Sequence, residues 1–418
     1  SPTFGAMSDE QLKRDRSRRA RVASPGSIAR HGRLPRSRAW VTVIAFLGAA
    51  MSVVLVATTA VAGIAIYQFT SDVGDKAVDI NDGSAAPIPE IGAYEGGFNI
   101  LVVGSDEYHD RDSVLNDVNM LVHVSADQTS AVAVSFPRDM VVPFPGCVNP
   151  KTGKVWGIGT GLPVNNALYY GGLPCVVNVI ENFTGLDIQY AGMIGFDGVA
   201  NLATAVGGVQ VCLTRAIHDK DSGIQLEAGT HYLSGWDALA FLRTRKGVGD
   251  GSDLSRIASQ QAFLSALLRK LKSEETLTNV GKLLSLANVA RDNMTLSTEL
   301  SQPATMVAMA KALSRIPMDR ITFVQYPGTT GGTGIYAGKV QPDKNRGTQL
   351  MDAIRADQPI GVEKPADGTS TEVDPNAPQQ PVDPSASPSD APVLPDKVVI
   401  SGVRGQTAAD QTCTRGNG

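Results

Sequence analysis

Residues 40–69 contain no charged side chain, and this uncharged stretch constrains the chain more than any other feature of the sequence. A helix that crosses the hydrocarbon core of a bilayer needs about 20 apolar residues. Trp40 and Tyr67 stand near the two ends of the stretch, where aromatic residues favour the membrane interface. A cleavable signal peptide has a shorter apolar region, of about 7–15 residues. The sequence therefore predicts one transmembrane helix over residues 40–69 instead of a cleavable leader.

Charge is unevenly divided between the two sides of this stretch. Residues 1–39 hold ten Lys and Arg against three Asp and Glu, and because the whole chain carries −4, residues 40–418 carry −11. Basic residues beside a transmembrane helix stay on the cytoplasmic side. We therefore expect a single-pass protein of the cell membrane, with a cytoplasmic basic arm over residues 1–39 and an extracellular body. An arginine-rich arm can also bind nucleic acid, but topology explains it more simply, and we expect no nucleic-acid partner.

The body contains four cysteines, Cys147, Cys175, Cys212 and Cys413. None lies in a Cys-x-x-Cys motif or a Cys/His cluster, so their spacing argues against a zinc site. An even number of cysteines in an extracytoplasmic domain is typical of disulfides, and four cysteines allow three pairings. Cys147 and Cys175 flank one loop-rich segment, which favours a bond between them and leaves the other pairings open.

Composition divides the body into four parts. Residues 70–97 are rich in Gly, Ala, Pro and Asp and are interpreted as a stalk. Residues 98–360 form the predicted ordered extracellular domain, with its core over residues 99–272. Residues 361–395 are dominated by Pro, Ser, Asp, Ala and Gln, a composition typical of a disordered tail. Residues 396–418 form a short C-terminal segment in which we expect one strand, at the run VVIS.

Apolar runs of strand length alternate with helical patterns along the domain. This alternation predicts an α/β fold of the α+β sandwich type, in which helices flank a central mixed β-sheet. The Gly-rich stretch 328–338 lacks the Lys-Ser/Thr of a phosphate-binding loop and is interpreted as a flexible connection. Strands are expected at 99–104, 119–125, 131–136, 209–213 and 320–326, and helices at 173–184, 196–206, 235–242, 255–272, 277–289 and 303–315.

Charged and amide side chains gather beside the ends of these apolar runs, which is where α/β proteins collect their functional groups. The residues concerned are Asp106 after NILVVGS, Asp117 before NMLVHVS, Arg138 and Asp139 in SFPRD, Arg243 and Arg245 in FLRTR, and Asp253, Arg256 and Gln260 in DLSRIASQ.

Several arginines with several carboxylates, and no candidate catalytic His or Cys, indicate one kind of chemistry. Arginine binds phosphate oxygens through two parallel hydrogen bonds. Carboxylates bind Mg²⁺ while waters and substrate phosphates complete its shell. Such a site performs phosphoryl transfer by positioning and charge neutralisation. On composition alone, structural ion pairs around a core explain the same residues at least as well.

The order of the motifs adds a resemblance to the LytR-CpsA-Psr family. The matching segments follow the family's order between Asn99 and Lys272, with weaker agreement to about Ala356. The most specific of them is the predicted helix that ends in FLRTR, together with the motif D-x-x-R-x-x-x-Q in the helix that follows it. The segments are NILVVGSD (99–106), NDVNMLVHVS (116–125), AVSFPRDM (133–140), VNNALYYGG (164–172), IGFDGVANLATAVGGVQV (194–211), LSGWDALAFLRTRKGVGDGSDLSRIASQQAFL (233–264) and VQYPG (324–328).

The resemblance implies a Mg²⁺-assisted phosphotransferase, with Mn²⁺ as an alternative metal. Such an enzyme takes a glycan from a polyprenyl pyrophosphate and joins it to the 6-hydroxyl of N-acetylmuramic acid in peptidoglycan. A long apolar tunnel between sheet and helices would hold the lipid. By residue, the resemblance implies metal binding by Asp106 and Asp117, pyrophosphate binding by Arg138, Arg243, Arg245 and Arg256, an orienting or pocket-lining role for Asp139, Asp253 and Gln260, and Asn165 nearby.

One position departs from the family pattern. Many members carry an arginine two residues before the second metal-binding aspartate, where this chain has Leu115, and Arg111 is close by but not in that register. One phosphate contact is therefore expected to be missing or supplied by another residue. The outer cysteines, the acidic tail and the Ala-rich and Val-rich composition resemble an actinobacterial member.

Three other functions stay open on the sequence. A pyrophosphatase acting on the same lipid would use water in place of the sugar hydroxyl. A membrane-bound transcriptional attenuator would use the basic arm on DNA, although residues 1–39 show no helix-turn-helix pattern. A non-catalytic wall protein would use its arginines to bind an anionic glycan.

Overall fold

The computed structural model describes residues 77–80, 96–107, 114–274, 276–363, 366, 370–377 and 395–418. The chain divides into two compact units, residues 1–63 and 64–418, and every described residue belongs to the second. The basic arm and the transmembrane helix predicted over residues 1–69 therefore lie outside the described residues, as does most of the predicted stalk. Within the described part, no helix has the length and hydropathy needed to cross a bilayer.

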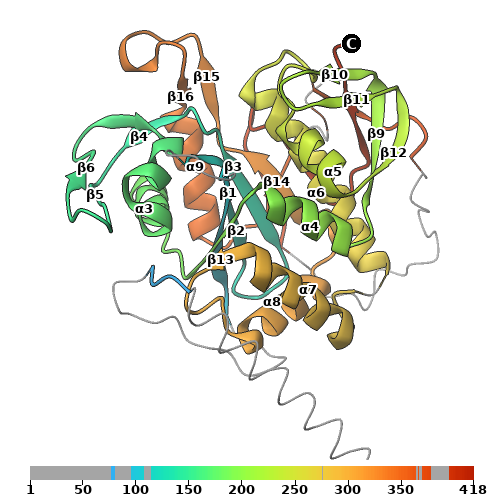
Figure 1. The fold of residues 1–418 in the computed structure, drawn as a ribbon, viewed down its shortest axis with the longest axis horizontal. Helices are drawn as coiled ribbons and strands as arrows, with labels where there is room; N and C mark the ends of the chain where they lie inside the picture. The colour runs from blue at the N-terminus through green and yellow to red at the C-terminus, as the bar shows by residue number, and fades with distance from the viewer. Residues whose placement is uncertain are drawn as a thin grey trace, which may run out of the picture. The chain divides into compact units, whose positions relative to one another are not determined.

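A seven-stranded mixed sheet forms the centre of the second unit (Figure 1). The first strand pairs antiparallel with the second and parallel with the eighth, so the sheet is mixed, as predicted. The third and fourteenth strands extend it by a parallel pair. In spatial order the strands are β13 (Met294–Leu296), β8 (Tyr190–Ile194), β1 (Phe98–Ser105), β2 (Asn116–Val124), β3 (Ala131–Phe136), β14 (Ile321–Gln325) and β20 (Gly405–Thr407).

Helices cover both faces of this sheet (Figure 1). Side chains alternate between the two faces of a strand. Leu121 and Val134 point to the face that packs on α3 and α9, whereas Val124 and Ala133 point to the face that packs on α6 and α8. Because both faces are covered, every residue of β3 is buried. The helices are α3 (Ala167–Thr184), α4 (Phe196–Ala205), α5 (Gly235–Arg243), α6 (Asp253–Ser273), α7 (Val280–Asn293), α8 (Pro303–Arg315) and α9 (Lys344–Arg355), with short 3-10 helices η1 (Val164–Asn166), η2 (Met318–Arg320) and η3 (Gly334–Tyr336).

The helix predicted from residue 173 begins earlier, at Ala167. Gly171 and Gly172 interrupt it with non-helical backbone angles, and φ at Gly172 is +70°, a conformation that favours glycine. The prediction therefore recognised only the regular part after this kink.

A second, four-stranded sheet packs against α6 and contains strands that the sequence analysis missed. Part of the tail predicted to be disordered is strand, and the C-terminal segment supplies one strand to each sheet. These strands are short and polar, so they carry no apolar signal and depend on pairing, β20 with β14, β21 with β9 and β18 with β21. In spatial order the second sheet contains β12 (Gly229–Leu233), β9 (Val209–Arg215), β21 (Thr412–Arg415) and β18 (Thr371–Val373).

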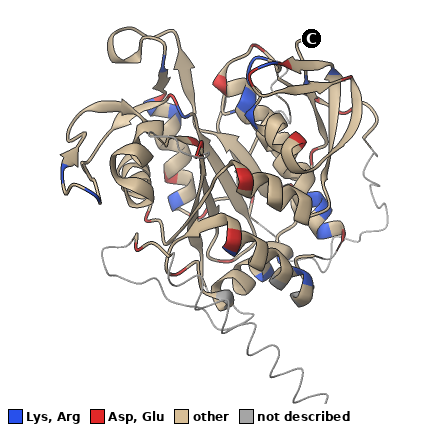
Figure 2. Cartoon of the chain, in the orientation of Figure 1, with Lys and Arg blue, Asp and Glu red and all other residues tan. Residues whose placement is uncertain are grey.

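Five two-stranded ribbons complete the described structure. The Gly-rich stretch predicted to be a flexible connection is mostly a hairpin, β15–β16, closed by η3. Residues 140–180, which include β4 to β7, contain Lys151 and Lys154 but no Asp or Glu, and Figure 2 shows blue without red along β5 and β6. The ribbons are β4 (Val141–Pro143) with β7 (Gly161–Pro163), β5 (Cys147–Val148) with β6 (Val155–Trp156), β10 (Ile217–Asp219) with β11 (Ile224–Leu226), β15 (Gly328–Thr330) with β16 (Val340–Pro342), and β17 (Ile360–Gly361) with β19 (Val398–Val399).

Two disulfides connect these parts. Cys147 is bonded to Cys175, which confirms the favoured pairing and ties the β5–β6 ribbon to α3. Cys212 is bonded to Cys413 across a sequence separation of 201 residues, which ties β9 to β21. The second bond therefore holds the C-terminal segment in the second sheet.

We predict that the two disulfides contribute unequally to stability. The entropy that a crosslink removes from the unfolded chain grows with loop length, and the loops differ as 28 to 201 residues. Replacing Cys212 and Cys413 by Ala should cost about 2 kcal/mol more than replacing Cys147 and Cys175 by Ala. Urea unfolding of the two double variants measures the difference. Equal losses would show that loop length does not determine the contribution.

Candidate active site

The two aspartates predicted to bind a metal stand on neighbouring strands at one end of the central sheet. The register of β1 and β2 shifts there, since Gly104 pairs with Val118 and Ser105 pairs with Asn116. Asp117 is therefore the extra residue of a bulge, which changes the direction of its side chain. Asp106 continues β1, where its backbone N–H donates to the Leu115 carbonyl and its Oδ1 accepts from the Leu115 N–H at 2.7 Å.

Asp117 is the centre of an ion-pair network with two arginines. Its Oδ1 lies 2.6 Å from Nη1 of Arg138, and its Oδ2 lies 4.0 Å from Nη1 of Arg256. The Asp117 carbonyl also accepts a hydrogen bond of 2.9 Å from Nη2 of Arg256. Burial alone would lower the pKa of Arg138, but the charge and hydrogen bond of Asp117 outweigh it, so this pKa lies above its ordinary value.

The first turn of α6 completes the network. Ser252 caps the helix by accepting a hydrogen bond from the Ser255 N–H, which places Asp253 and Arg256 in the first turn. Asp253 lies 2.6 Å from Nη2 of Arg256, and its other oxygen accepts from the Arg138 N–H at 3.2 Å. Only 5% of the Arg256 side chain is exposed, and this burial lowers its pKa.

Both arginines retain donor capacity. The Nε–H groups of Arg138 and Arg256 are buried and have no hydrogen-bond partner among the described residues. A buried donor without a partner is costly, and an anion bound beside the two guanidinium groups would supply acceptors. This arrangement favours an anion site over a purely structural cluster of ion pairs.

A second pair of arginines comes from the end of α5 and from the loop that follows it. Arg243 ends the helix, with its guanidinium carbon 4.2 Å from the centre of the Phe196 ring. Nη2 of Arg245 lies 3.9 Å from Asp139. Arg138, Arg243, Arg245 and Arg256 line one cavity of about 370 Å³ together with Asp117. The cavity wall holds five cations, the fifth being Lys246, against three carboxylates.

Five of the predicted site residues do not line this cavity, namely Asp253, which is described above, and four others. Asp139 contacts Arg138, Arg245 and also Lys339, whose Nζ is 3.9 Å away. Gln260 donates from Nε2 to the Leu242 carbonyl, so it supports the end of α5 directly before Arg243. The remaining two are Asn165, whose backbone N–H donates to the Arg138 carbonyl, and Asp106 at the end of β1. Arg111 lies outside the described residues.

Sequence reasoning missed Asp219, which lines the cavity. Asp219 holds the loop between α5 and α6, residues 244–252, which carries Arg245 and is called the arginine loop below. The residue is 4% exposed, and its Oδ2 accepts from the Thr244 hydroxyl at 2.7 Å and from the Arg245 N–H at 3.1 Å. Burial would raise the pKa of this carboxyl, but these hydrogen bonds and one from the Asp221 N–H outweigh it and keep the pKa low. Asp219 precedes a turn in the run IHDKDSG. The contact could not be predicted because Asp219 and Arg245 are far apart in the sequence.

The C-terminal segment also holds this loop. The Gly249 N–H donates to the Arg415 carbonyl at 3.0 Å, and the Asn417 N–H donates to the Gly247 carbonyl at 3.1 Å. The end of β21 therefore pairs with the loop that carries Arg245. Through the Cys212–Cys413 bond, the same strand is fixed to β9.

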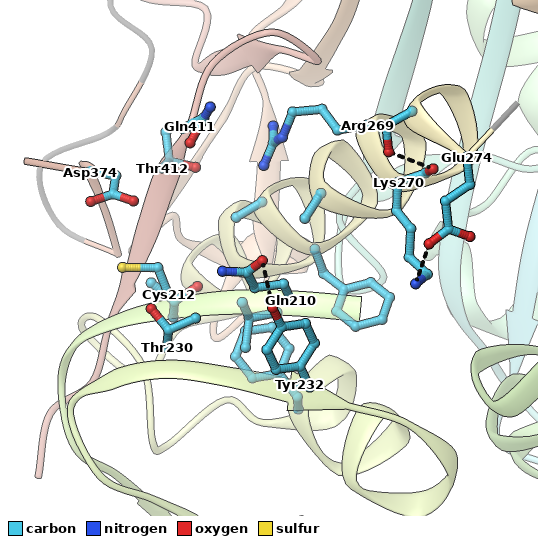
Figure 3. A pocket seen from close by; sticks show the side chains of 17 residues that line it. Gln210, Cys212, Thr230, Tyr232, Arg269, Lys270, Glu274, Asp374, Gln411 and Thr412 are labelled. Atoms are coloured by element: carbon cyan, nitrogen blue, oxygen red, sulfur yellow. Dashed lines mark hydrogen bonds and ion pairs between the residues drawn. The ribbon is translucent and has the colours of Figure 1, made fainter. Parts of the chain in front are cut away.

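Another cavity, of about 460 Å³, lies between β9, β12 and α6 (Figure 3). Its cations are already engaged, because Nη1 of Arg269 donates to the Ala408 and Asp410 carbonyls and Lys270 pairs with Glu274 at 2.9 Å. At its rim Asp374 approaches two cysteine sulfurs, but these form the Cys212–Cys413 disulfide and are not metal ligands. The arginine cavity is therefore the better anion site of the two.

Of the two predicted metal ligands, Asp117 lines the arginine cavity, whereas Asp106 stands at the end of β1 and does not line it. Asp106 and Asp117 offer carboxylate oxygens, which Mg²⁺ prefers, and a phosphate bound by the neighbouring arginines would supply more oxygens. Because Asp117 already forms an ion pair with Arg138, a metal bound to Asp117 would share this carboxylate with Arg138.

Comparison with known proteins identifies relatives of this chain. A family model described as the LytR_cpsA_psr family matches residues 63–353. The cell wall biosynthesis protein LcpA of Corynebacterium glutamicum is 29% identical over 295 residues, which cover 63% of this chain and 56% of LcpA. The polyisoprenyl-teichoic acid–peptidoglycan teichoic acid transferase TagT of Bacillus subtilis is 25% identical over 317 residues, which cover 73% of this chain and 91% of TagT.

The matched regions have limits. The chain spans about half the length of the Corynebacterium relatives that it matches. Among solved structures, the protein gbs0355 from Streptococcus agalactiae has a TM-score of 0.54 and 20% identity, covering 63% of this chain and 88% of that one. At this identity the likeness shows a shared fold alone.

We predict that Asp219 stabilises the arginine loop only while it is ionised. Asp219→Asn should lower the free energy of unfolding by about 2 kcal/mol at neutral pH, since charge-assisted hydrogen bonds are lost. Because the folded pKa lies below the ordinary value of about 3.9, the contribution is complete above that value and is lost as the pH falls through the folded pKa. Urea unfolding of wild type and variant at neutral and acidic pH measures this.

The matched control is Asp221→Asn, whose carboxylate is 66% exposed and pairs with Lys246 on the surface. This variant should unfold like the wild type, because exposed ion pairs contribute little. A loss in Asp219→Asn that stays the same at acidic pH would contradict the assignment.

Proposed function

The chain belongs to the LytR-CpsA-Psr family, as its motifs predicted, and we propose that it transfers a phosphate-linked glycopolymer from a polyprenyl pyrophosphate to peptidoglycan. The observation that carries the proposal is the cavity wall on which Arg138, Arg243, Arg245, Arg256 and Lys246 stand together, while the buried Nε–H groups of Arg138 and Arg256 have no hydrogen-bond partner among the described residues. Two adjacent phosphates match such a site better than an uncharged sugar does. The name of TagT, a transferase of polyisoprenyl-linked teichoic acid to peptidoglycan, supports the same reaction class.

The reaction breaks one phosphoanhydride bond and forms one phosphodiester. The 6-hydroxyl of N-acetylmuramic acid attacks the phosphorus that carries the glycan and loses its proton. The bridging oxygen leaves with the lipid as polyprenyl phosphate. Negative charge grows on the phosphoryl oxygens and on the bridging oxygen in this step, which is where fixed guanidinium groups lower the barrier.

The described residues divide this work between holding phosphate and holding arginines. Arg138 after β3 and Arg256 in the first turn of α6 would bind the pyrophosphate together with Arg243 at the end of α5 and Arg245 in the loop after it. Asp253 holds Arg256, and Asp139 approaches Arg138 and Arg245. Gln260 supports the end of α5.

Asp106 and Asp117 would hold Mg²⁺, or Mn²⁺ in its place, beside the pyrophosphate. A divalent cation there supplies charge neutralisation of the phosphate oxygens. The site residues would in this way combine two carboxylates for the metal with four arginines for the substrate.

We also propose the topology that the sequence predicts. The helix expected over residues 40–69 would anchor the protein in the cell membrane, with the catalytic domain on the outer side. An anchored enzyme stays close to a lipid substrate that cannot leave the bilayer. Water in place of the sugar hydroxyl would turn the same site into a pyrophosphatase.

We predict that the full chain releases polyprenyl phosphate from a glycan-linked polyprenyl pyrophosphate when peptidoglycan and Mg²⁺ are present. Asp117→Ala and Arg243→Ala should each slow turnover at least about 100-fold, because fixed charges at a phosphoryl-transfer site contribute that much. Chelation should stop turnover, and Mg²⁺ or Mn²⁺ should restore it. The released lipid, measured by chromatography, reports the rate.

Arg355→Ala is the matched control, since Arg355 lies on α9 and forms an ion pair with Asp352 outside the cavity. It should keep wild-type turnover. Full activity in both site variants would refute the site assignment. A wild-type protein that binds glycan without turnover would support a non-catalytic binding protein instead.

A further inference from the structure

Exposed apolar side chains concentrate on one part of the described surface. Val148, Val155, Trp156 and Ile158 are all exposed within a short segment around the β5–β6 ribbon, with Ile158 at 67%. We use the name apolar tip for a set that adds two exposed neighbours and two lysines. The apolar tip is Val148, Val155, Trp156, Ile158, Tyr169 of α3 and Ile335 of η3, with Lys151 and Lys154.

These side chains lie together on a braced framework. Val148 and Val155 are a cross-strand pair, and the Cβ position of Gly146 lies within 3.3 Å of both Val155 and Ile158. The Trp156 ring stacks on Tyr170 with centroids 5.8 Å apart, and Tyr170 also contacts Tyr169. The Cys147–Cys175 bond fixes the ribbon to α3. The tip is therefore an exposed apolar surface on a braced support.

Ile335 brings a second element to the same surface. Its Cδ1 lies 3.0 Å from the Cβ position of Gly161 in β7. The hairpin of β15 and β16 thus contacts residues 140–164, which carry most of the tip and are called the excursion below. Residues 328–342 of this hairpin contain Lys339 and no Asp or Glu.

The charge around the tip is of one sign. Residues 140–180 contain Lys151 and Lys154 and no carboxylate, although residues 40–418 carry −11 overall. Figure 2 shows this difference, with blue but no red along β5 and β6. Aromatic and aliphatic side chains flanked by lysines favour the headgroup region of an anionic bilayer.

The excursion that carries the tip starts and ends at the candidate active site. It leaves the sheet directly after Arg138 and Asp139, and the Asn165 N–H on its return donates to the Arg138 carbonyl at 3.0 Å. The hairpin is joined at the same place, because the Val340 N–H donates to the Asp139 carbonyl at 3.0 Å. Few residues therefore separate the apolar tip from Arg138 and Asp139 along the backbone hydrogen bonds.

We propose that the apolar tip is a membrane contact in its own right, which inserts into the headgroup region of an anionic bilayer. This contact is separate from the predicted helix over residues 40–69, and it rests on the proposed function only for the lipid nature of the substrate. A second copy of the chain is the competing occupant. A symmetric contact between two tips would bring lysines against lysines, which disfavours it.

The test uses the three tryptophans of the full chain, Trp40, Trp156 and Trp236. The chain is reconstituted in vesicles of phosphatidylcholine and phosphatidylglycerol that contain brominated lipid, which quenches nearby indoles. In Trp40→Phe/Trp236→Phe, the sole indole is Trp156, and it should lose most of its emission. Trp40→Phe/Trp156→Phe is the control, because Trp236 is similarly exposed, at 54%, but lies on α5 away from the tip. Its emission should hardly change.

Charge gives the second arm of the test. Vesicles without phosphatidylglycerol, or the added substitutions Lys151→Glu and Lys154→Glu, should reduce the quenching of Trp156. Equal quenching of Trp156 and Trp236 overturns the proposal. Trp156 that is shielded from aqueous iodide yet not quenched by brominated lipid also overturns it, and indicates a second copy. Neither reading needs turnover, so failure of the proposed transfer reaction is detected separately.

Discussion

The site depends on the ion pairs of the buried Arg256 guanidinium. It stands in the first turn of α6 and is neutralised by Asp253 and by Asp117 of β2. Breaking a buried ion pair by removing one partner costs about 3–5 kcal/mol, because the other charge stays buried alone. Since Asp253 also accepts from the Arg138 N–H, one network joins the central sheet, the end of β3 and α6. The fold and the proposed phosphate site therefore share the same residues.

The arginine loop is held from a different direction. Asp219 accepts hydrogen bonds from Thr244 and Arg245, and the strand after Cys413 pairs with Gly247 and Gly249. The disulfide between Cys212 and Cys413 fixes that strand to β9. The short C-terminal segment, residues 396–418, thus supports the loop that carries Arg245. The two arginine pairs at the cavity therefore have separate supports.

Regular elements and motif residues were predictable, whereas the contacts between distant segments were not. Short apolar runs marked β1 and β3, and the ends of these runs marked Asp117 and Arg138. The bulge at Asp117 depends on the register between two strands, which no single run of residues reveals. Asp219 and the polar strand β21 gave no apolar signal, because long-range pairing and hydrogen bonds hold them. The Gly-rich hairpin also gave no apolar signal, although its two strands are neighbours in the sequence.

The central claim is that the arginine cavity binds the pyrophosphate of a lipid carrier. A crystal structure of the protein with a short-chain polyprenyl pyrophosphate and Mg²⁺ tests it most directly. The account predicts phosphate oxygens within hydrogen-bond distance of the Nε–H groups of Arg138 and Arg256, with the metal between Asp106, Asp117 and the phosphates. Phosphates bound in the cavity between β9 and α6, with Arg138 and Arg256 unchanged, would contradict it.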